Sequence, residues 1–264
     1  MTFDSTGKHS FDDVYSATDP RPYFRTLREV DYHLPQLAKP YFAKLVEEHH
    51  VSTVLDVGCS YGVNAALYRC DTTMDELYAY YGSEKAAGLD RAALVARDRA
   101  RLRDSRVRFV GLDVSEPALA YATDAGFLDD AVSADLENAG PTPEQSAVLA
   151  GADLVVSTGC IGYVTERTIA RLADLPGRRR PAMAHFVLRM FSYEPVADAL
   201  AVLGYETVGE PGLFRQRRFA SAQEQEQILD AMRANGVTPH ELETDGWLCA
   251  QLYLSRPTDP RGRQ

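Results

Sequence analysis

Short apolar runs alternate with segments of helical periodicity from about residue 51 onward. The apolar runs lie at residues 53–55, 107–112, 131–132, 152–156 and 183–190. A sixth strand region is expected at 205–208 and 215–219, and a seventh at 246–254. The segments between them, at residues 116–125, 143–150, 165–175 and 193–203, have the pattern of short amphipathic helices. This alternation predicts an α/β fold for residues 51–257.

Three segments have no place in that alternation and are predicted to be helical additions. Residues 1–50 form a cap or lid with helices at 27–37 and 41–48 separated by Pro40. Residues 70–105 form an insertion with one helix at 86–102, and residues 221–235 form a helix whose Ser221 and Glu224 make a capping box. Residues 258–264 are predicted to be a disordered tail. The cap is rich in aromatics: Phe3, Phe11, Tyr15, Tyr23, Phe24, Tyr32, Tyr41 and Phe42.

A glycine-bearing turn follows the first predicted strand. The strand ends in Asp56, and Gly58, Ser60 and Gly62 follow at a spacing of two before a helix begins. Backbone N–H groups in such a turn can approach a ligand closely where no Cβ intervenes. The turn therefore predicts a ligand site at the carboxyl end of the first strand.

The stretch Asp56-x-Gly58-x-Ser60-x-Gly62 resembles the first cofactor motif of class I S-adenosylmethionine-dependent methyltransferases, with serine in place of the middle glycine. Residues 110–119 resemble the second motif, whose acid would be Asp113 and would bind the ribose hydroxyls. Residues 131–136 resemble the third, in which Asp135 would meet the adenine amino group, and residues 152–159 resemble the fourth strand and its active-site end.

This resemblance covers about residues 51–160 and implies a Rossmann-like, doubly wound, seven-stranded and mostly parallel sheet with an antiparallel last strand. It also implies S-adenosyl-L-methionine as the cofactor. The residues assigned to the cofactor on this basis are Asp56, Gly58, Cys59, Ser60, Gly62, Asp113, Val114, Asp135, Leu136, Ser157 and Thr158.

A dinucleotide-dependent oxidoreductase carries a similar glycine turn and is the nearest alternative. There the second glycine lets the backbone approach a pyrophosphate, so Ser60 is awkward. The ribose-binding acid of that class lies about 20 residues further on. Near that spacing, Asp75 and Glu76 follow no apolar strand, which favours the methyltransferase interpretation.

Composition and charge exclude several classes of protein. The chain has 264 residues and a formal net charge of −10, whereas non-specific nucleic-acid binding requires a basic surface. The four cysteines show no pattern of metal ligands, so no metal site is predicted and the thiols are expected to be reduced. Neither a membrane span nor a signal peptide is evident, so a cytoplasmic location is expected.

Methyl transfer requires no fixed catalytic constellation, and three side chains are candidates for a role at the reacting centre. Tyr163 follows the fourth strand and could orient a substrate or simply pack on the next helix. Arg189 could bind a substrate anion or belong to a structural ion pair. His33, expected on a helix of the cap, could serve as a general base or be an ordinary surface residue.

Two other groups are predicted to be structural. His185, on an apolar strand, is predicted to be a core histidine. Residues 215–218 read Arg-Gln-Arg-Arg, and strand alternation would place Arg215 and Arg217 on one face. That run either solvates an edge or binds a carboxylate or phosphate.

The sequence as a whole predicts a methyltransferase acting on a small molecule, without nucleic-acid or membrane partners and with a homodimer left open. Its arginine- and alanine-rich composition resembles that of actinobacterial enzymes of specialised (natural-product) metabolism. A cyclase or decarboxylase that uses the same cofactor without transferring methyl, and a non-catalytic scaffold, remain as alternatives. The acids at positions 56, 113 and 135 argue against the scaffold.

Overall fold

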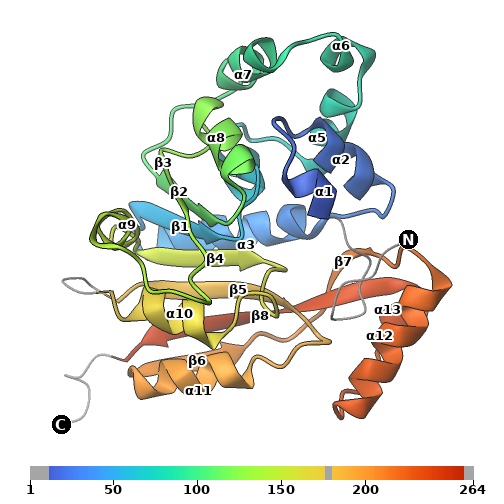
Figure 1. Ribbon diagram of the computed structural model, residues 1–264. Helices are drawn as coiled ribbons and strands as arrows, with labels where there is room; N and C mark the ends of the chain where they lie inside the picture. Colours follow the sequence, from blue (N-terminus) through green and yellow to red (C-terminus); the bar gives the residue numbers. More distant parts are fainter. Residues whose placement is uncertain (1–11, 176–179, 259–264) are drawn as a thin grey trace.

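A twisted, mostly parallel sheet organises the computed structural model, which describes residues 12–175 and 180–258 (Figure 1). The strands are β1 (Thr53–Val57), β2 (Arg108–Asp113), β3 (Asp130–Ser133), β4 (Leu154–Thr158), β5 (Ala182–Leu188), β6 (Tyr205–Gly209), β7 (Phe214–Arg218) and β8 (Trp247–Pro257). They lie in the order β3-β2-β1-β4-β5-β8-β6, with β7 also paired to β8. Strands β1 to β5 are mutually parallel, and β8 is antiparallel to β5. This is the order of the class I methyltransferase fold, so the predicted fold class is confirmed.

The sixth strand region is divided into two strands that share β8. Strand β6 pairs with Tyr253–Pro257 of β8, and β7 pairs with Trp247–Ala250. Eight strands therefore fill the seven expected positions. The register of β7 is interrupted at Gln216, because Arg215 pairs with Cys249 while Arg217 pairs with the adjacent Leu248. This β-bulge breaks the alternation expected for residues 215–218.

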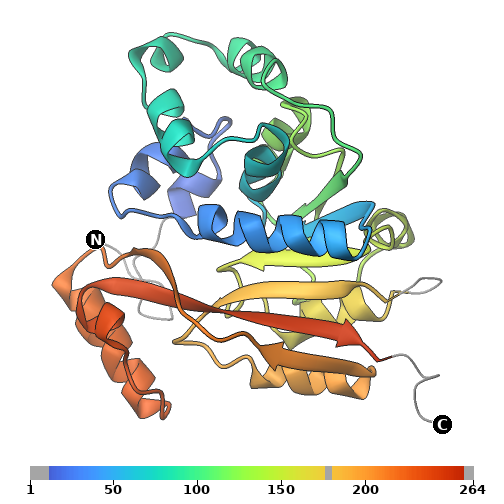
Figure 2. The same cartoon turned by 180° about the vertical axis from the view of Figure 1, so that it is seen from behind.

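Helices cover both faces of the sheet. One face carries α3 (Leu34–Glu48), α4 (Val63–Arg69) and α8 (Glu116–Asp124), and Figure 2 shows α3 lying across it. The other face carries α9 (Pro143–Leu149), α10 (Glu166–Ala173) and α11 (Glu194–Val202). Residues of β1 alternate between the two cores: Val54 joins the first, and Leu55 and Val57 join the second. Asp56 therefore points toward the face that carries α4.

The N-terminal segment differs from its predicted helices. It forms α1 (Asp12–Tyr15), α2 (Arg21–Arg28) and α3, and α3 runs through Pro40 without a break. The predicted helix at 27–37 is wrong, because residues 29–33 form a turn in which Asp31 has a positive φ of 52°. Two backbone hydrogen bonds attach this turn to β7, from His33 N to Gln216 O (2.9 Å) and from Arg218 N to Val30 O (2.6 Å). Pairing with β7 thus replaces the helical hydrogen bonds that the local pattern favoured.

The insertion is helical but is not one helix. It forms α5 (Met74–Tyr81), α6 (Glu84–Ala87) and α7 (Arg91–Arg99), so the single helix predicted at 86–102 is wrong. The interruption comes at Gly88-Leu89-Asp90, where the Asp90 side chain caps the start of α7. Figure 1 shows α1 and α2 beside α5 at one end of the molecule.

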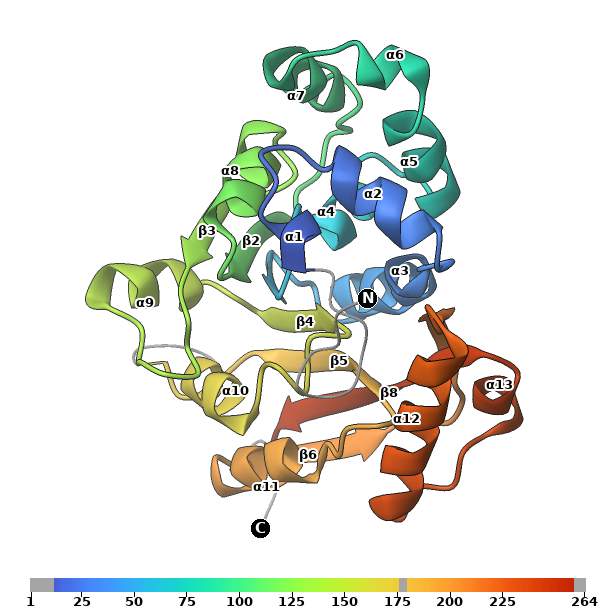
Figure 3. The same cartoon turned by 45° about the vertical axis from the view of Figure 1, so that its right-hand side comes forward.

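The C-terminal helices stand beside β8, as Figure 3 shows for α12 (Ala222–Ala234) and α13 (Glu241–Thr244). The Ser221 side chain caps α12 by accepting a hydrogen bond from Glu224 N. The Glu224 carboxylate does not return to the Ser221 backbone but binds Arg217 and Ala220 N, so only half of the predicted capping box forms. Thr258 bonds to Gly204 O, and the rest of the predicted tail lies outside the described residues, as do Phe3 and Phe11.

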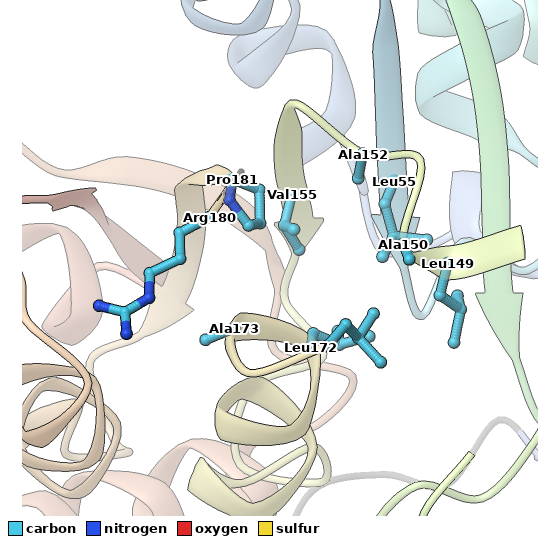
Figure 4. Close-up of a pocket in the computed structure, with 10 residues that line it drawn as sticks. Leu55, Leu149, Ala150, Ala152, Val155, Leu172, Ala173, Arg180 and Pro181 are labelled. Carbon is cyan, nitrogen blue, oxygen red and sulfur yellow. The ribbon is translucent and has the colours of Figure 1, made fainter. Parts of the chain in front are cut away.

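Two negative observations concern the described part of the chain. None of its helices is long and apolar enough to cross a membrane. Figure 4 shows a hollow at the amino ends of β4 and β5, lined by apolar residues such as Leu55, Val155 and Leu172. Its volume of about 10 Å³ is that of a single water at most, so it is a packing defect rather than a ligand site.

Candidate functional site

A cavity of about 780 Å³ lies at the carboxyl ends of β1, β2 and β4, beneath the N-terminal helices. Ligands of open α/β sheets bind at this edge, and the volume is within the range of small-molecule sites. The lining residues come from the turn after β1, the end of β2, the segment after β4, the N-terminal segment and β7. They are Tyr15, Ser16, Tyr23, Leu27, Tyr32, Pro35, Gly58, Cys59, Ser60, Val63, Asn64, Asp113, Val114, Ser115, Glu116, Pro117, Thr158, Gly159, Cys160, Tyr163, Gln216 and Arg217.

The turn after β1 has the backbone that its sequence predicted. Gly58, Ser60 and Gly62 all have positive φ, at 65°, 49° and 68°. A Cβ on Gly58 would lie 2.6 Å from the Cβ of Cys160, so this position admits only glycine. Ser60 occupies the left-handed region in spite of its side chain, which identifies it as a strained position in the wall of the cavity.

Asp113 closes this turn from the neighbouring strand. Its carboxylate accepts hydrogen bonds from Ser60 N (2.8 Å) and Ser115 N (2.9 Å). Burial raises the pKa of Asp113, while these backbone hydrogen bonds lower it. The hydroxyl oxygen of Ser60 is buried and has no hydrogen-bond partner. Asp113 at the end of β2 and Ser60 in the turn after β1 thus line the cavity side by side.

Because Ser60 has a positive φ, we expect Ser60→Gly to stabilise the fold by about 1 kcal/mol, relieving the cost of a side chain in the left-handed region. Ser60→Ala should bring no such gain, since it keeps the Cβ. Thermal unfolding of the two variants checks this, and equal midpoints would show that the turn is not strained.

Asp56 and Asn64 form a buried pair at the base of the cavity. Asn64 Nδ2 donates to both carboxylate oxygens of Asp56 (3.0 and 3.2 Å) and lies 3.2 Å from Thr158 Oγ1. The amide nitrogen of Asn64 therefore faces Asp56. Asn64 Oδ1 is left buried without a partner in a side chain that lines the cavity. It is a ready acceptor for a ligand N–H or O–H.

Burial raises the pKa of Asp56 from 3.8 to about 7, although the hydrogen bonds from Asn64 oppose the shift. Between about pH 4 and pH 7, Asp56 is therefore mostly protonated in the folded protein and mostly ionised in the unfolded chain. Across that window this group should lower the free energy of unfolding as pH rises, by at most about 1.4 kcal/mol per pH unit. Chemical denaturation of the parent and Asp56→Asn between pH 5 and 8 tests this, because the parent should lose stability relative to the variant. Parallel curves would contradict the shift.

Six of the residues assigned to the cofactor line the cavity and five do not. Gly58, Cys59, Ser60, Asp113, Val114 and Thr158 line it. Asp56 and Gly62 support it from behind, Gly62 as the residue before α4. Ser157 points away and bonds to His185 Nδ1 (2.7 Å). Leu136 belongs to the core of the opposite face, and the Asp135 side chain accepts from Glu137 N and Asn138 Nδ2.

Of the three candidates for the reacting centre, only Tyr163 lines the cavity, and its ring lies 6.2 Å from that of Phe191. His33 is not on a helix. Its Nε2 lies 3.1 Å from Asp75 Oδ1, away from the cavity. Arg189 forms an ion pair with Glu243 and lines a separate hollow of about 530 Å³ beyond β5.

His185 is a core histidine, as predicted. It is fully buried, and burial lowers its pKa to about 3, so the ring is neutral. The run at residues 215–218 is divided by the bulge: Arg217 is buried in a pair with Glu224, whereas Arg218 lies over the Trp247 ring. Within residues 12–175 and 180–258, no group of three His, Cys, Asp or Glu side chains could hold a metal ion.

Two parts of the cavity wall were not identified from the sequence. Asn64 is the second residue of α4, and a polar residue at the start of a helix that follows a glycine turn was the available signal. Gln216 comes from β7 and lines the cavity beside the bulge. The local sequence gives no sign of this bulge. The number of aromatic residues in the cap predicted an aromatic wall. The sequence did not show that Tyr15, Tyr23 and Tyr32 would be the ones to form it.

Comparison with known proteins gives similarity at the level of structure only. No family model matches the chain, and no curated protein matches it. A functionally unknown protein from Deinococcus radiodurans R1 is 16% identical, with 92% of this chain and 90% of that chain covered and a TM-score of 0.39. The TehB-like SAM-dependent methyltransferase of Corynebacterium glutamicum is 13% identical over 80% and 85%, with a TM-score of 0.38. The plantazolicin methyltransferase BpumL, solved in complex with SAH, is 14% identical over 94% and 92%, with a TM-score of 0.39. These distant similarities do not define the activity of this chain.

Proposed function

We propose that the protein is an S-adenosylmethionine-dependent methyltransferase that acts on a small molecule. The observation that carries the proposal is the turn at Gly58 and Ser60, tied to Asp113 beneath a cavity at the carboxyl edge of the sheet. The residues fit the cofactor on two counts. Ser60 Oγ and Asn64 Oδ1 are buried acceptors without partners, and Gly58, which lines the cavity, has no Cβ to keep a ligand from its backbone.

S-adenosylmethionine, when bound, supplies a methyl group that its positively charged sulfur already activates. The chain has only to hold, orient and shield the reacting groups. Asp113 and Val114 would take the ribose end, and the turn at residues 58–60 with Asn64 would take the amino-acid end. Asp135 is left out of this proposal, since its carboxylate serves the loop that follows β3.

The N-terminal segment would exclude water from that site. Tyr61, within the cofactor turn, donates its hydroxyl hydrogen bond to Val14 O (3.0 Å) and Ala17 O (2.8 Å). Ser115, after β2, donates to Tyr15 O. Both ends of the cofactor site thus bind the same covering segment, and Tyr15 and Ser16 of that segment line the cavity.

Calorimetric titration with S-adenosylhomocysteine, S-adenosylmethionine and NAD⁺ tests the proposed cofactor. We expect binding of the first two and not of NAD⁺. Incubation of candidate acceptors with methyl-labelled S-adenosylmethionine then tests the reaction, since a cyclase or decarboxylase would leave no label on the acceptor. Preferential binding of NAD⁺ would overturn the proposal, and binding of none of the three would favour a scaffold.

Asp113→Ala should weaken binding of S-adenosylhomocysteine by about 10- to 150-fold. The reason is the loss of an acceptor to the ribose, worth roughly 1.5–3 kcal/mol for a charged group. The matched control is Asp135→Ala, which also removes a carboxylate but from outside the cavity, and it should change affinity by less than about threefold. A larger effect at Asp135 than at Asp113 would mean that the adenine and ribose contacts are differently placed.

A further inference from the structure

Gln216 carries an unsatisfied hydrogen-bonding group into the cavity from the side opposite β2. The residue is only 5% exposed, and its Oε1 is buried without a partner. Leaving a buried acceptor unmatched is costly, so such an atom in a cavity wall points to a ligand that donates to it.

The local structure is arranged to present this amide. The bulge in β7 turns both Gln216 and Arg217 inward, between Arg215 and Arg218, which are exposed. The backbone of Gln216 is held by His33 N, which donates to its carbonyl (2.9 Å). Bulges commonly redirect a side chain next to a functional site, and here the bulge places an amide in the cavity.

Gly159 leaves the space that this amide occupies. It follows β4 at a positive φ of 79°, and a Cβ there would lie 2.4 Å from Gln216 Nε2. Thr158, Gly159 and Cys160 line the cavity together with Gln216, and Thr158 Oγ1 lies 3.2 Å from Nδ2 of Asn64, one of the proposed cofactor contacts. The amide therefore faces the part of the cavity that adjoins the cofactor.

Much of the cavity that Gln216 lines is aromatic and apolar. The N-terminal segment contributes Tyr15, Tyr23, Leu27, Tyr32 and Pro35 to its wall, and the loop after β4 contributes Tyr163. Aromatic side chains of this kind suit a flat or apolar ligand and hold it with few rotatable bonds. The tyrosines are held in place by edge-on contacts, such as that between Tyr15 and Tyr23 at 5.7 Å.

The charges in the wall do not favour an anionic ligand. Arg217 is the cation among the described lining residues, and its guanidinium forms a two-pronged pair with Glu224, at 3.0 and 2.7 Å. The charges at the other end are the acids Asp113 and Glu116. A carboxylate or phosphate on the ligand would therefore be desolvated without a free positive partner among these residues.

We propose that Gln216 Oε1 accepts a hydrogen bond from the methyl acceptor, and that the acceptor is an uncharged aromatic molecule carrying a hydroxyl or N–H donor. This deepens the proposed function, on which the identity of the neighbouring ligand rests. Gln216 is thereby a substrate-binding residue, and its donor requirement selects against anionic acceptors and against molecules of the same shape that lack the donor.

Three naphthalene probes of the same body test this on protein saturated with S-adenosylhomocysteine. 2-Naphthol has a donor, 2-methoxynaphthalene has none, and 2-naphthoate is an anion. Fluorescence titration should show that the parent binds 2-naphthol at least about tenfold more tightly than either of the others. Gln216→Leu should abolish that preference, and Gln216→Glu, which keeps an acceptor oxygen, should retain the preference for 2-naphthol over the ether. Gln227→Leu, the same change at an exposed position of α12, should behave as the parent.

Each of several results would overturn the inference. They are equal binding of 2-naphthol and its ether to the parent, tighter binding of 2-naphthoate, an unchanged preference in Gln216→Leu, or binding of none of the probes. Failure of the proposed function is seen separately, as lack of S-adenosylhomocysteine binding in calorimetry. In that case the three probes are compared on the unliganded protein. Circular dichroism of every variant confirms that each is folded.

Discussion

Deletion of residues 1–30 should leave a protein that does not fold. The segment contributes Tyr23, Phe24 and Leu27 to the main core, each 4% exposed or less. The ring of Phe24 stacks on that of Tyr81 at 4.5 Å, and Tyr23 packs edge-on against Tyr61 of the cofactor turn at 5.6 Å. Removing α2 would expose these partners together, so we expect an aggregated product or one without a cooperative thermal transition.

A single substitution in α2 tests the same contribution to stability without removing the whole segment. Phe24→Ala should lower the free energy of unfolding by about 3–5 kcal/mol, as expected for truncation of a buried aromatic. Arg25→Ala, at the exposed neighbouring position, should change it by less than about 0.5 kcal/mol. If the truncated protein instead folded and bound S-adenosylhomocysteine but lost turnover, the segment would be a mobile lid. The burial of α2 favours a docked cap.

The sequence was most informative where local pattern and tertiary structure agree. The strands of the parallel sheet are buried on both faces and read as continuous apolar runs, so their order along the chain and their helices could be anticipated. The glycine turn was predictable for a different reason: Gly58 must leave space for Cys160 and Gly62 must begin α4 with a positive φ. Such backbone requirements are visible in the residue types themselves.

The errors arise where distant contacts overrule the local pattern. The turn at residues 29–33 gives up helical hydrogen bonds because β7 supplies others through His33 and Arg218. Gln216 enters the cavity because of a bulge whose position depends on pairing with β8. His33 and Arg189 were reasonable candidates by residue type, yet each found a carboxylate outside the cavity, Asp75 and Glu243. The residue types showed what His33 and Arg189 could do chemically, and the fold determined which carboxylate each of them contacts.

The pair of Arg217 and Glu224 should be the most sensitive polar contact in the C-terminal region. Both side chains are nearly inaccessible, at 4% and 0% exposure, and the guanidinium binds both carboxylate oxygens. Glu224 also accepts from Ala220 N (2.7 Å) at the start of α12. Removing Glu224 would take the two-pronged carboxylate contact from a buried guanidinium, so Glu224→Leu should cost about 3–5 kcal/mol of stability in denaturant unfolding.

The double variant Arg217→Met/Glu224→Leu separates the charge effect from the loss of packing. Apolar residues of similar volume remove both buried charges, and such replacements are often neutral or stabilising, so most of the loss in Glu224→Leu should be recovered. Asp230→Leu, which breaks the exposed ion pair with Arg233 on the same helix, is the control and should have little effect. If the double variant were as unstable as Glu224→Leu, the hydrogen bond to Ala220 N would be the contact that matters. Recovery would show instead that the cost of Glu224→Leu comes mainly from the buried charge of Arg217, which the pair with Glu224 neutralises in the parent protein.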